Sequence, residues 1–192
     1  MSLGSVSTIE KRVSDAVEPA AAEALESARA APIKHADGTS WVRAGAMFSL
    51  WVLATTAVTV FMVLPNGQKE TLRDRFFGRV IGILVSDRAT ALKFWVMKHR
   101  QVCWAHLVRK FRSFSERDGP AGAIGQELLD YTGLIFDYWS RFRRGELTRE
   151  TLIERMAPVR PQVEALLLRG QNAKIRGLSG SCKDMLEHRE AL

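Results

Sequence analysis

Cysteine is scarce in this sequence, and several common signatures of function are missing. The 192 residues contain only two cysteines, Cys103 and Cys182, which is too few for a disulfide framework and typical of a reducing compartment. The N-terminus has no apolar run of signal-peptide length, so we expect a cytoplasmic protein. No Walker loop, dinucleotide-binding glycine fingerprint, nucleophile elbow or HExxH helix occurs, and no internal repeat is present.

One long stretch lacks charge altogether. Residues 45–67 contain no charged side chain, and Arg43 and Lys69 flank them. By length this stretch could be a single membrane span. Its β-branched and aromatic residues and its polar breaks instead favour a two-stranded hairpin, with strands at 47–54 and 58–65. The hairpin is our prediction, and a single-span membrane protein is the alternative.

Positive charge is in excess. The net charge of +7 and the pI near 9.8 favour a polyanionic partner or a membrane surface, although solubility alone could explain them. Basic residues interleaved with aromatic ones cluster in residues 106–117 and 139–149. Such segments can contact phosphates and stack on unpaired bases, or they can be solvated helix faces. The candidate nucleic-acid contacts are Arg109, Lys110, Arg112, Arg141, Arg143 and Arg144.

The predicted elements change character along the chain. Strands and helices alternate to about residue 118, and only helices follow. This order indicates an α/β fold with an all-α segment appended or inserted. We divide the chain into a helical arm (1–32), an α/β core (33–118) and an all-α segment (119–192). The local predictions include a second helix starting at Pro19, a strand over 33–37, a turn at Gly38–Thr39, a strand over 80–85 and a helix over 89–96. Residues 68–77 are predicted to form an amphipathic helix with Leu72, Phe76 and Phe77 facing inward.

Two aspartates, Asp37 and Asp87, each end a strand-like run. Carboxylates brought together on adjacent strands can hold a divalent metal ion that activates water for phosphoryl chemistry. A single aspartate at a strand end is more often a turn or helix-capping residue, and Asp87 could cap a helix starting at Arg88. Their spacing alone therefore leaves both interpretations open.

Cys103 and His106 form a second candidate pair. Their separation of three residues can present two ligands to zinc, but no second cysteine–histidine pair lies close by. The alternative is a buried strand end, with Cys103 as a small apolar residue.

Four motifs in order, SLGSVS, HADGTSW, GILVSD and CWAHLVRKF, resemble the transposases of the insertion-sequence-66 family over nearly the whole chain. The resemblance implies a ribonuclease-H-like fold whose mixed sheet begins with three antiparallel strands. It also implies a DDE site, in which two aspartates and a glutamate bind two Mg²⁺ or Mn²⁺ ions for cleavage and strand transfer on DNA. By motif match Asp37 is the first acid and Asp87 the second, and Cys103 and His106 lie beside the site. The implied partners are transposon ends, target DNA and other transposase subunits.

The chain departs from the family pattern at two places. The family usually has Asp-Glu-Thr where this chain has Asp37-Gly38-Thr39. The family's third acid lies in an Asn-Asn-x-x-Glu-Arg type segment that does not occur here, and we assign that role to neither Glu187 nor Glu190. We therefore expect a central fragment with an incomplete triad and little or no strand transfer. The alternative is a DNA-binding remnant without catalysis.

Overall fold

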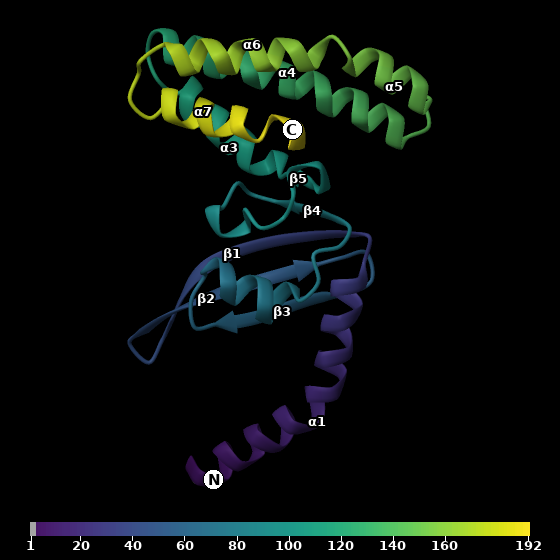
Figure 1. Cartoon of the computed structure of the whole chain (residues 1–192), viewed down its shortest axis with the longest axis vertical. Helices are drawn as coiled ribbons and strands as arrows, with labels where there is room; N and C mark the ends of the chain where they lie inside the picture. The colour runs from purple at the N-terminus through teal and green to yellow at the C-terminus, as the bar shows by residue number, and fades with distance from the viewer. Residues whose placement is uncertain (1–2) are drawn as a thin grey trace. The chain divides into compact units, whose positions relative to one another are not determined.

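The computed structural model consists of two compact units, and the boundary between them lies between Gln101 and Val102 (Figure 1). The structure describes residues 3–192. The first unit holds a long helix and nearly all of a sheet, and the second unit is helical. The sequence places the start of the helical segment at residue 119, whereas the helical unit begins at Val102.

The N-terminal helix α1 (Leu3–Ala30) is continuous through Pro19. The prediction of a second helix starting at Pro19 is therefore wrong. Ala28 is the one buried residue of α1 among the described positions, so only the C-terminal end of this helix packs into the core. The apolar stripe along its N-terminal half, which includes Val13 and Val17, is exposed.

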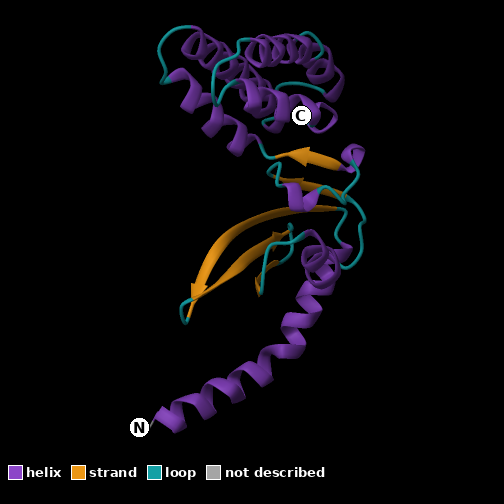
Figure 2. Ribbon diagram, turned by 60° about the vertical axis from the view of Figure 1, so that its left-hand side comes forward, coloured by secondary structure: helices purple, strands orange, loops and turns teal. Residues whose placement is uncertain are grey.

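The sheet contains five strands in the order β3-β2-β1-β4-β5. Strands β1 and β2 and strands β2 and β3 pair antiparallel, whereas β1 and β4 run parallel (Figure 2). This mixed sheet with helical segments is consistent with a ribonuclease-H-like fold, as predicted. The strands are β1 (Ile33–Arg43), β2 (Ala46–Ala54), β3 (Thr59–Leu64), β4 (Ile83–Ser86) and β5 (Arg100–Val102).

The charge-free stretch forms β2 and β3, so the predicted hairpin is confirmed. None of the helices within residues 3–192 is both long and apolar enough to cross a membrane.

Strand β1 is longer than the sequence indicates. No turn forms at Gly38–Thr39, because β2 pairs with β1 at every position from His35 to Arg43. The turn lies instead at Ala44 and Gly45, which both have positive φ (49° and 77°). The long antiparallel ladder overrides the local turn preference of Asp-Gly.

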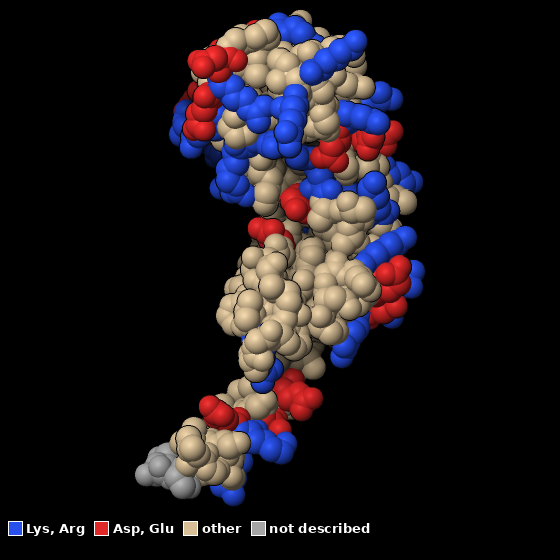
Figure 3. Space-filling view, turned by 90° about the vertical axis from the view of Figure 1, so that its left-hand side faces the viewer, with Lys and Arg blue, Asp and Glu red and all other residues tan. Residues whose placement is uncertain are grey.

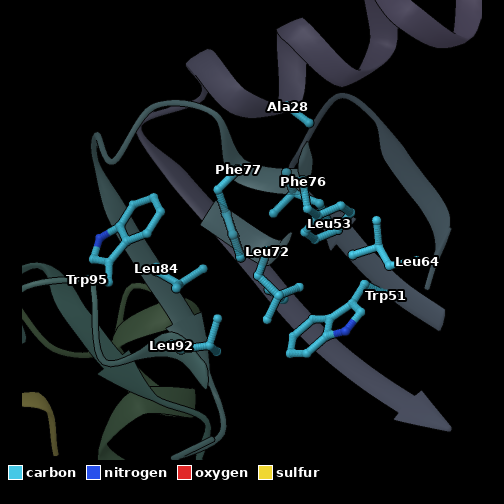
Figure 4. Packing of buried hydrophobic residues seen from close by; sticks show 11 residues of the cluster. Ala28, Trp51, Leu53, Leu64, Leu72, Phe76, Phe77, Leu84, Leu92 and Trp95 are labelled. Atoms are coloured by element: carbon cyan, nitrogen blue, oxygen red, sulfur yellow. The ribbon is translucent and has the colours of Figure 1, made fainter. Parts of the chain in front are cut away.

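A short helical segment covers one face of the sheet. It consists of α2 (Lys69–Thr71) and the π-helical η1 (Leu72–Phe77), which the sequence predicts as one amphipathic helix. Ring contacts connect Trp51 to Phe76 (6.2 Å), Phe76 to Phe77 (5.1 Å) and Phe77 to Trp95 (5.4 Å). The buried cluster in Figure 4 comprises Ala28, Ala36, Trp51, Leu53, Leu64, Leu72, Phe76, Phe77, Leu84, Leu92 and Trp95.

The predicted helix over 89–96 is wrong. Only the 3-10 turns η2 (Thr90–Leu92) and η3 (Met97–His99) form between β4 and β5. Leu92 and Trp95 are buried, and the Trp95 indole N–H donates to the Gly82 carbonyl (3.2 Å). The burial of these two side chains and the hydrogen bond of Trp95 hold the segment against the core, although it does not form a regular helix.

The helical unit packs α3 on α4 and α6 on α7. Two glycines allow close approach: a Cβ at Gly125 would lie 2.3 Å from the Ser115 nitrogen, and one at Gly170 would lie 2.5 Å from the Cys182 sulfur. The helices are α3 (Trp104–Ser115), α4 (Pro120–Arg143), α5 (Arg149–Met156), α6 (Val159–Asn172) and α7 (Ser179–Glu187), followed by η4 (Arg189–Ala191).

Candidate functional site

The parallel pairing of β1 and β4 brings Asp37 and Asp87 together. Ala36 pairs with Ser86 at the last position of this ladder, and each aspartate follows directly in its own strand path. Neighbouring strands lie about 4.8 Å apart. The backbones of the two aspartates therefore lie one position beyond this pair on neighbouring strand paths, although the residues are about fifty positions apart in the sequence.

Each aspartate accepts a local backbone hydrogen bond. The Asp37 Oδ1 accepts from the Gly38 N–H (2.9 Å), and the Asp87 Oδ1 accepts from the Ala89 N–H (3.0 Å). No helix starts at Arg88, so Asp87 does not act as the helix cap that the sequence allows. Its bond to Ala89, two residues on, is the turn interaction typical of aspartate.

Asp37 lies on the sheet face opposite the core. Ala36 and Lys34 are buried on the core face, and successive side chains of a strand alternate between faces. Across the sheet, Asp37 pairs with Val52, which pairs with Phe61. A shallow cavity of about 160 Å³ beside Asp37 is lined by Gly38, Thr39, Leu50, Val52 and Phe61. The first carboxylate therefore borders an apolar, open surface.

Gly38, the residue after Asp37, packs against Trp51. A Cβ at position 38 would lie 2.5 Å from the Trp51 Cε2. Trp51 is the cross-strand partner of Gly38 and is buried. A glutamate at this position would require the Trp51 ring to move. The observed position of the Trp51 ring therefore requires a glycine at position 38.

A buried arginine fixes the end of β4. The Arg100 Nη2 donates to the Ser86 Oγ (3.1 Å) and to the Asp87 carbonyl (2.8 Å), and the Ser86 hydroxyl donates to the same carbonyl (2.9 Å). Burial lowers the pKa of the Arg100 guanidinium, and the charge of Asp87 opposes this shift. The sequence analysis missed Arg100, because nothing in a short strand distinguishes a buried arginine from an exposed one.

The chemistry of the pair suits a hard cation. Mg²⁺ and Mn²⁺ prefer carboxylate oxygens, and Asp37 and Asp87 provide two such groups. Within the described residues, no group of three or more histidine, cysteine, aspartate or glutamate side chains is arranged to hold a metal. Two carboxylates fit part of a divalent-metal site.

A family model described as "Transposase IS66 family" matches residues 1–191. The chain belongs to the IS66 transposase family. No curated protein and no solved structure matches the chain. Membership of the IS66 family supports a role in transposition.

In this IS66 family member, Cys103 and His106 lie in the helical unit at the start of α3. The Cys103 carbonyl accepts from the backbone N–H of His106 (3.0 Å), which begins the helix. Cys103 is a half-buried free thiol. A role for this pair near the catalytic site stays a prediction.

The predicted nucleic-acid contacts of this IS66 transposase domain fall into two classes. Arg141 lies 3.6 Å from Glu146, Arg144 also pairs with Glu146, and Lys110 lies over the Phe114 ring (5.5 Å). Arg109, Arg112 and Arg143 are exposed, and their guanidinium groups have no hydrogen bond or ion pair within residues 3–192. Figure 3 shows many Lys and Arg side chains over the helical unit.

Of the interleaved aromatic residues, two are unavailable for stacking on bases. Phe111 and Phe114 are buried in the helical unit, whereas Trp139 is 49% exposed and contacts Phe142 (5.6 Å). If bases stack on the helical unit, Trp139 and Phe142 are therefore the interleaved aromatic residues that could contact them.

Proposed function

We propose that this chain holds the first two carboxylates of the DNA cleavage and strand-transfer site of an IS66 transposase. Asp37 and Asp87 would bind Mg²⁺ or Mn²⁺. The observation that supports this role is their placement one step beyond the Ala36–Ser86 pair of the β1–β4 ladder.

The role of the protein groups follows from this placement. A bound divalent ion would supply Lewis acidity for attack of water, and then of a DNA 3′-hydroxyl, on a phosphodiester bond. The two strands would hold both carboxylates at one level, and the backbone N–H groups of Gly38 and Ala89 would orient them. With no third carboxylate grouped with the pair in the described chain, we expect weak metal binding and little or no strand transfer.

Mn²⁺ titration followed by electron paramagnetic resonance tests the metal site. Asp37→Asn and Asp87→Asn should each weaken Mn²⁺ binding, because each removes one of two anionic ligands. Asp15→Asn is the matched control, since Asp15 is exposed on α1 and pairs with Lys11 (3.0 Å). Equal Mn²⁺ binding by all four proteins would refute the proposed site.

A plasmid assay tests the expected lack of strand transfer. With Mg²⁺ and a supercoiled plasmid carrying the element ends, the chain should give no specific cleavage. Clear cutting at those ends would show that the two aspartates suffice or that another group completes the site.

A second candidate function is DNA binding without catalysis, in the cytoplasm and alone or with other transposase subunits. The exposed Arg109, Arg112 and Arg143, which lack partners within residues 3–192, favour it. It predicts salt-dependent DNA binding that is retained in Asp37→Asn and Asp87→Asn. Loss of binding in both variants would mean that the metal is integral to DNA binding, which contradicts this candidate.

A further inference from the structure

Arg100 is the most unusual charged residue of the first unit. Its side chain is 5% exposed, and its Nε and Nη1 atoms are buried without a hydrogen-bond partner. Its Nη2 donates two hydrogen bonds, one to the Ser86 Oγ and one to the Asp87 carbonyl. Burying a guanidinium with two unsatisfied nitrogens is costly, so a fold that keeps it there requires a compensating interaction.

Two other buried or half-buried cations of this unit, Lys34 and Arg29, bond to backbone carbonyls away from the two aspartates. The Lys34 Nζ donates to the carbonyls of Arg29 (2.7 Å) and Ile81 (2.8 Å) and lies over the Trp95 ring. Arg29 donates to the carbonyls of Arg75 and Phe76, which lie in the last turn of η1. Both stabilise chain reversals, and neither bonds to Asp37 or Asp87. Arg100 alone of the three contacts a candidate metal ligand.

We propose that Arg100 is a positioning residue that fixes the backbone of Asp87 for metal binding. This inference rests on the proposed metal site. The Asp87 carbonyl accepts from both Arg100 and Ser86, and the Asp87 carboxylate accepts from the Ala89 N–H. Main chain and side chain of Asp87 are thus both held where β4 ends, level with Asp37. Groups that orient metal ligands commonly contribute 10–100-fold to metal affinity.

Two roles for Arg100 predict opposite changes in metal affinity. A cation beside Asp87 repels a second cation, so if charge alone mattered, Arg100→Gln would tighten Mn²⁺ binding. If Arg100 positions Asp87, the same substitution weakens binding because the ligand is no longer held. The sign of the change in Kd therefore separates the two roles.

The experiment combines Mn²⁺ titration with hydrogen exchange on the full chain. For Arg100→Gln we expect an increase in the Mn²⁺ Kd of about 10-fold and faster amide exchange confined to residues 86–90. Arg100→Lys should restore part of both, since a lysine can still donate to the Asp87 carbonyl. Arg29→Gln is the matched control: it should speed exchange in residues 72–78 and leave the Mn²⁺ Kd unchanged.

The opposite result would be an unchanged or lower Kd in Arg100→Gln, or faster exchange over the whole unit with no local change. Either would overturn the positioning role. If Arg100→Gln does not fold, Ser86→Ala provides the second test, because it removes one of the two acceptors of Arg100. It should raise the Kd in the same direction.

Failure of the metal site itself gives a different pattern. If the unmodified chain binds no Mn²⁺, the proposed function fails, and the positioning of Asp87 is still tested by the exchange rates of residues 86–90. Unchanged local exchange in Arg100→Gln would then overturn the inference independently.

Discussion

At Gly38 there is no room for a side chain, because the Trp51 ring fills the position of a Cβ. We expect Gly38→Ala to lower the free energy of unfolding by about 1–3 kcal/mol, the usual cost of overpacking a filled site. Urea unfolding measures this. Gly133→Ala is the control, because a Cβ there meets nothing within 4 Å and alanine favours the helix.

A double-mutant cycle tests the cause. If Trp51 is responsible, the cost of Gly38→Ala should shrink in a Trp51→Leu background, since a smaller side chain frees the space. An equal cost in both backgrounds would mean that strand propensity, and not contact with the ring, determines the effect.

Cys182 belongs to α7 and is buried where this helix packs against Gly170 of α6. Burial raises the pKa of its thiol to about 11, from an ordinary value of 9.0. The folded chain therefore holds the thiol proton more tightly than the unfolded chain, and stability falls as pH rises from about 9 to about 11. The difference in unfolding free energy between the unmodified chain and Cys182→Ala should shift in that window.

Among the elements, β4 depends on a glycine at its entry. Gly82 has φ +74°, and a Cβ there would lie 2.4 Å from the Pro32 carbonyl oxygen, which accepts from the Ile83 N–H (2.8 Å). Gly82→Ala should displace β4 from β1 and so separate Asp87 from Asp37. We expect weaker Mn²⁺ binding together with lower stability.

Gly119 provides the matched control for Gly82. It has a similar φ of +68°, but a Cβ there meets nothing within 4 Å. Gly119→Ala should show backbone strain without loss of Mn²⁺ affinity. Equal loss in both variants would argue that general destabilisation, and not displacement of β4, weakens the site.

The elements that sequence reasoning predicted well are those with strong patterns. The β-branched run at 58–63 and the spacing of Leu72, Phe76 and Phe77 identify β3 and the buried face of η1. Prediction from the sequence failed where long-range contacts override the local conformational preference of the residues. The β2 ladder extends β1 through an Asp-Gly pair, and the burial of Leu92 and Trp95 replaces a helix by 3-10 turns.

The adjacency of Asp37 and Asp87 in the sheet could be predicted from the sequence, but the surroundings of the two residues could not. The sequence pattern indicates both aspartates as residues that follow strand-like runs, and Asp87 does follow β4, whereas Asp37 lies within the longer β1. The contact of Gly38 with Trp51 and the bonds of Arg100 depend on cross-strand register, which single-residue patterns do not fix. The functional roles of Asp37 and Asp87 stay a prediction.

For the whole molecule, the net charge of +7 predicts salt-sensitive binding to DNA. Replacing Arg109, Arg112 or Arg143 by glutamine should each reduce the slope of log K against log salt by about 1, if each contacts one phosphate. Arg144→Gln should change the slope less, because Glu146 already partners Arg144. Electrophoretic mobility shifts over a salt series measure these slopes. Equal slopes for all four variants would contradict the prediction that Arg109, Arg112 and Arg143 contact DNA phosphates.

The register of β1 with β4 also bears on the order of folding. The β1–β2 hairpin closes over two residues, whereas β4 must return across β2, β3 and the η1 segment before it can pair with β1. Closing the longer loop costs more entropy, so we expect it to follow the hairpin. A nascent or partly unfolded chain would hold Asp37 without Asp87. Under the proposed function, metal binding by both aspartates would then begin only once β4 has joined the sheet.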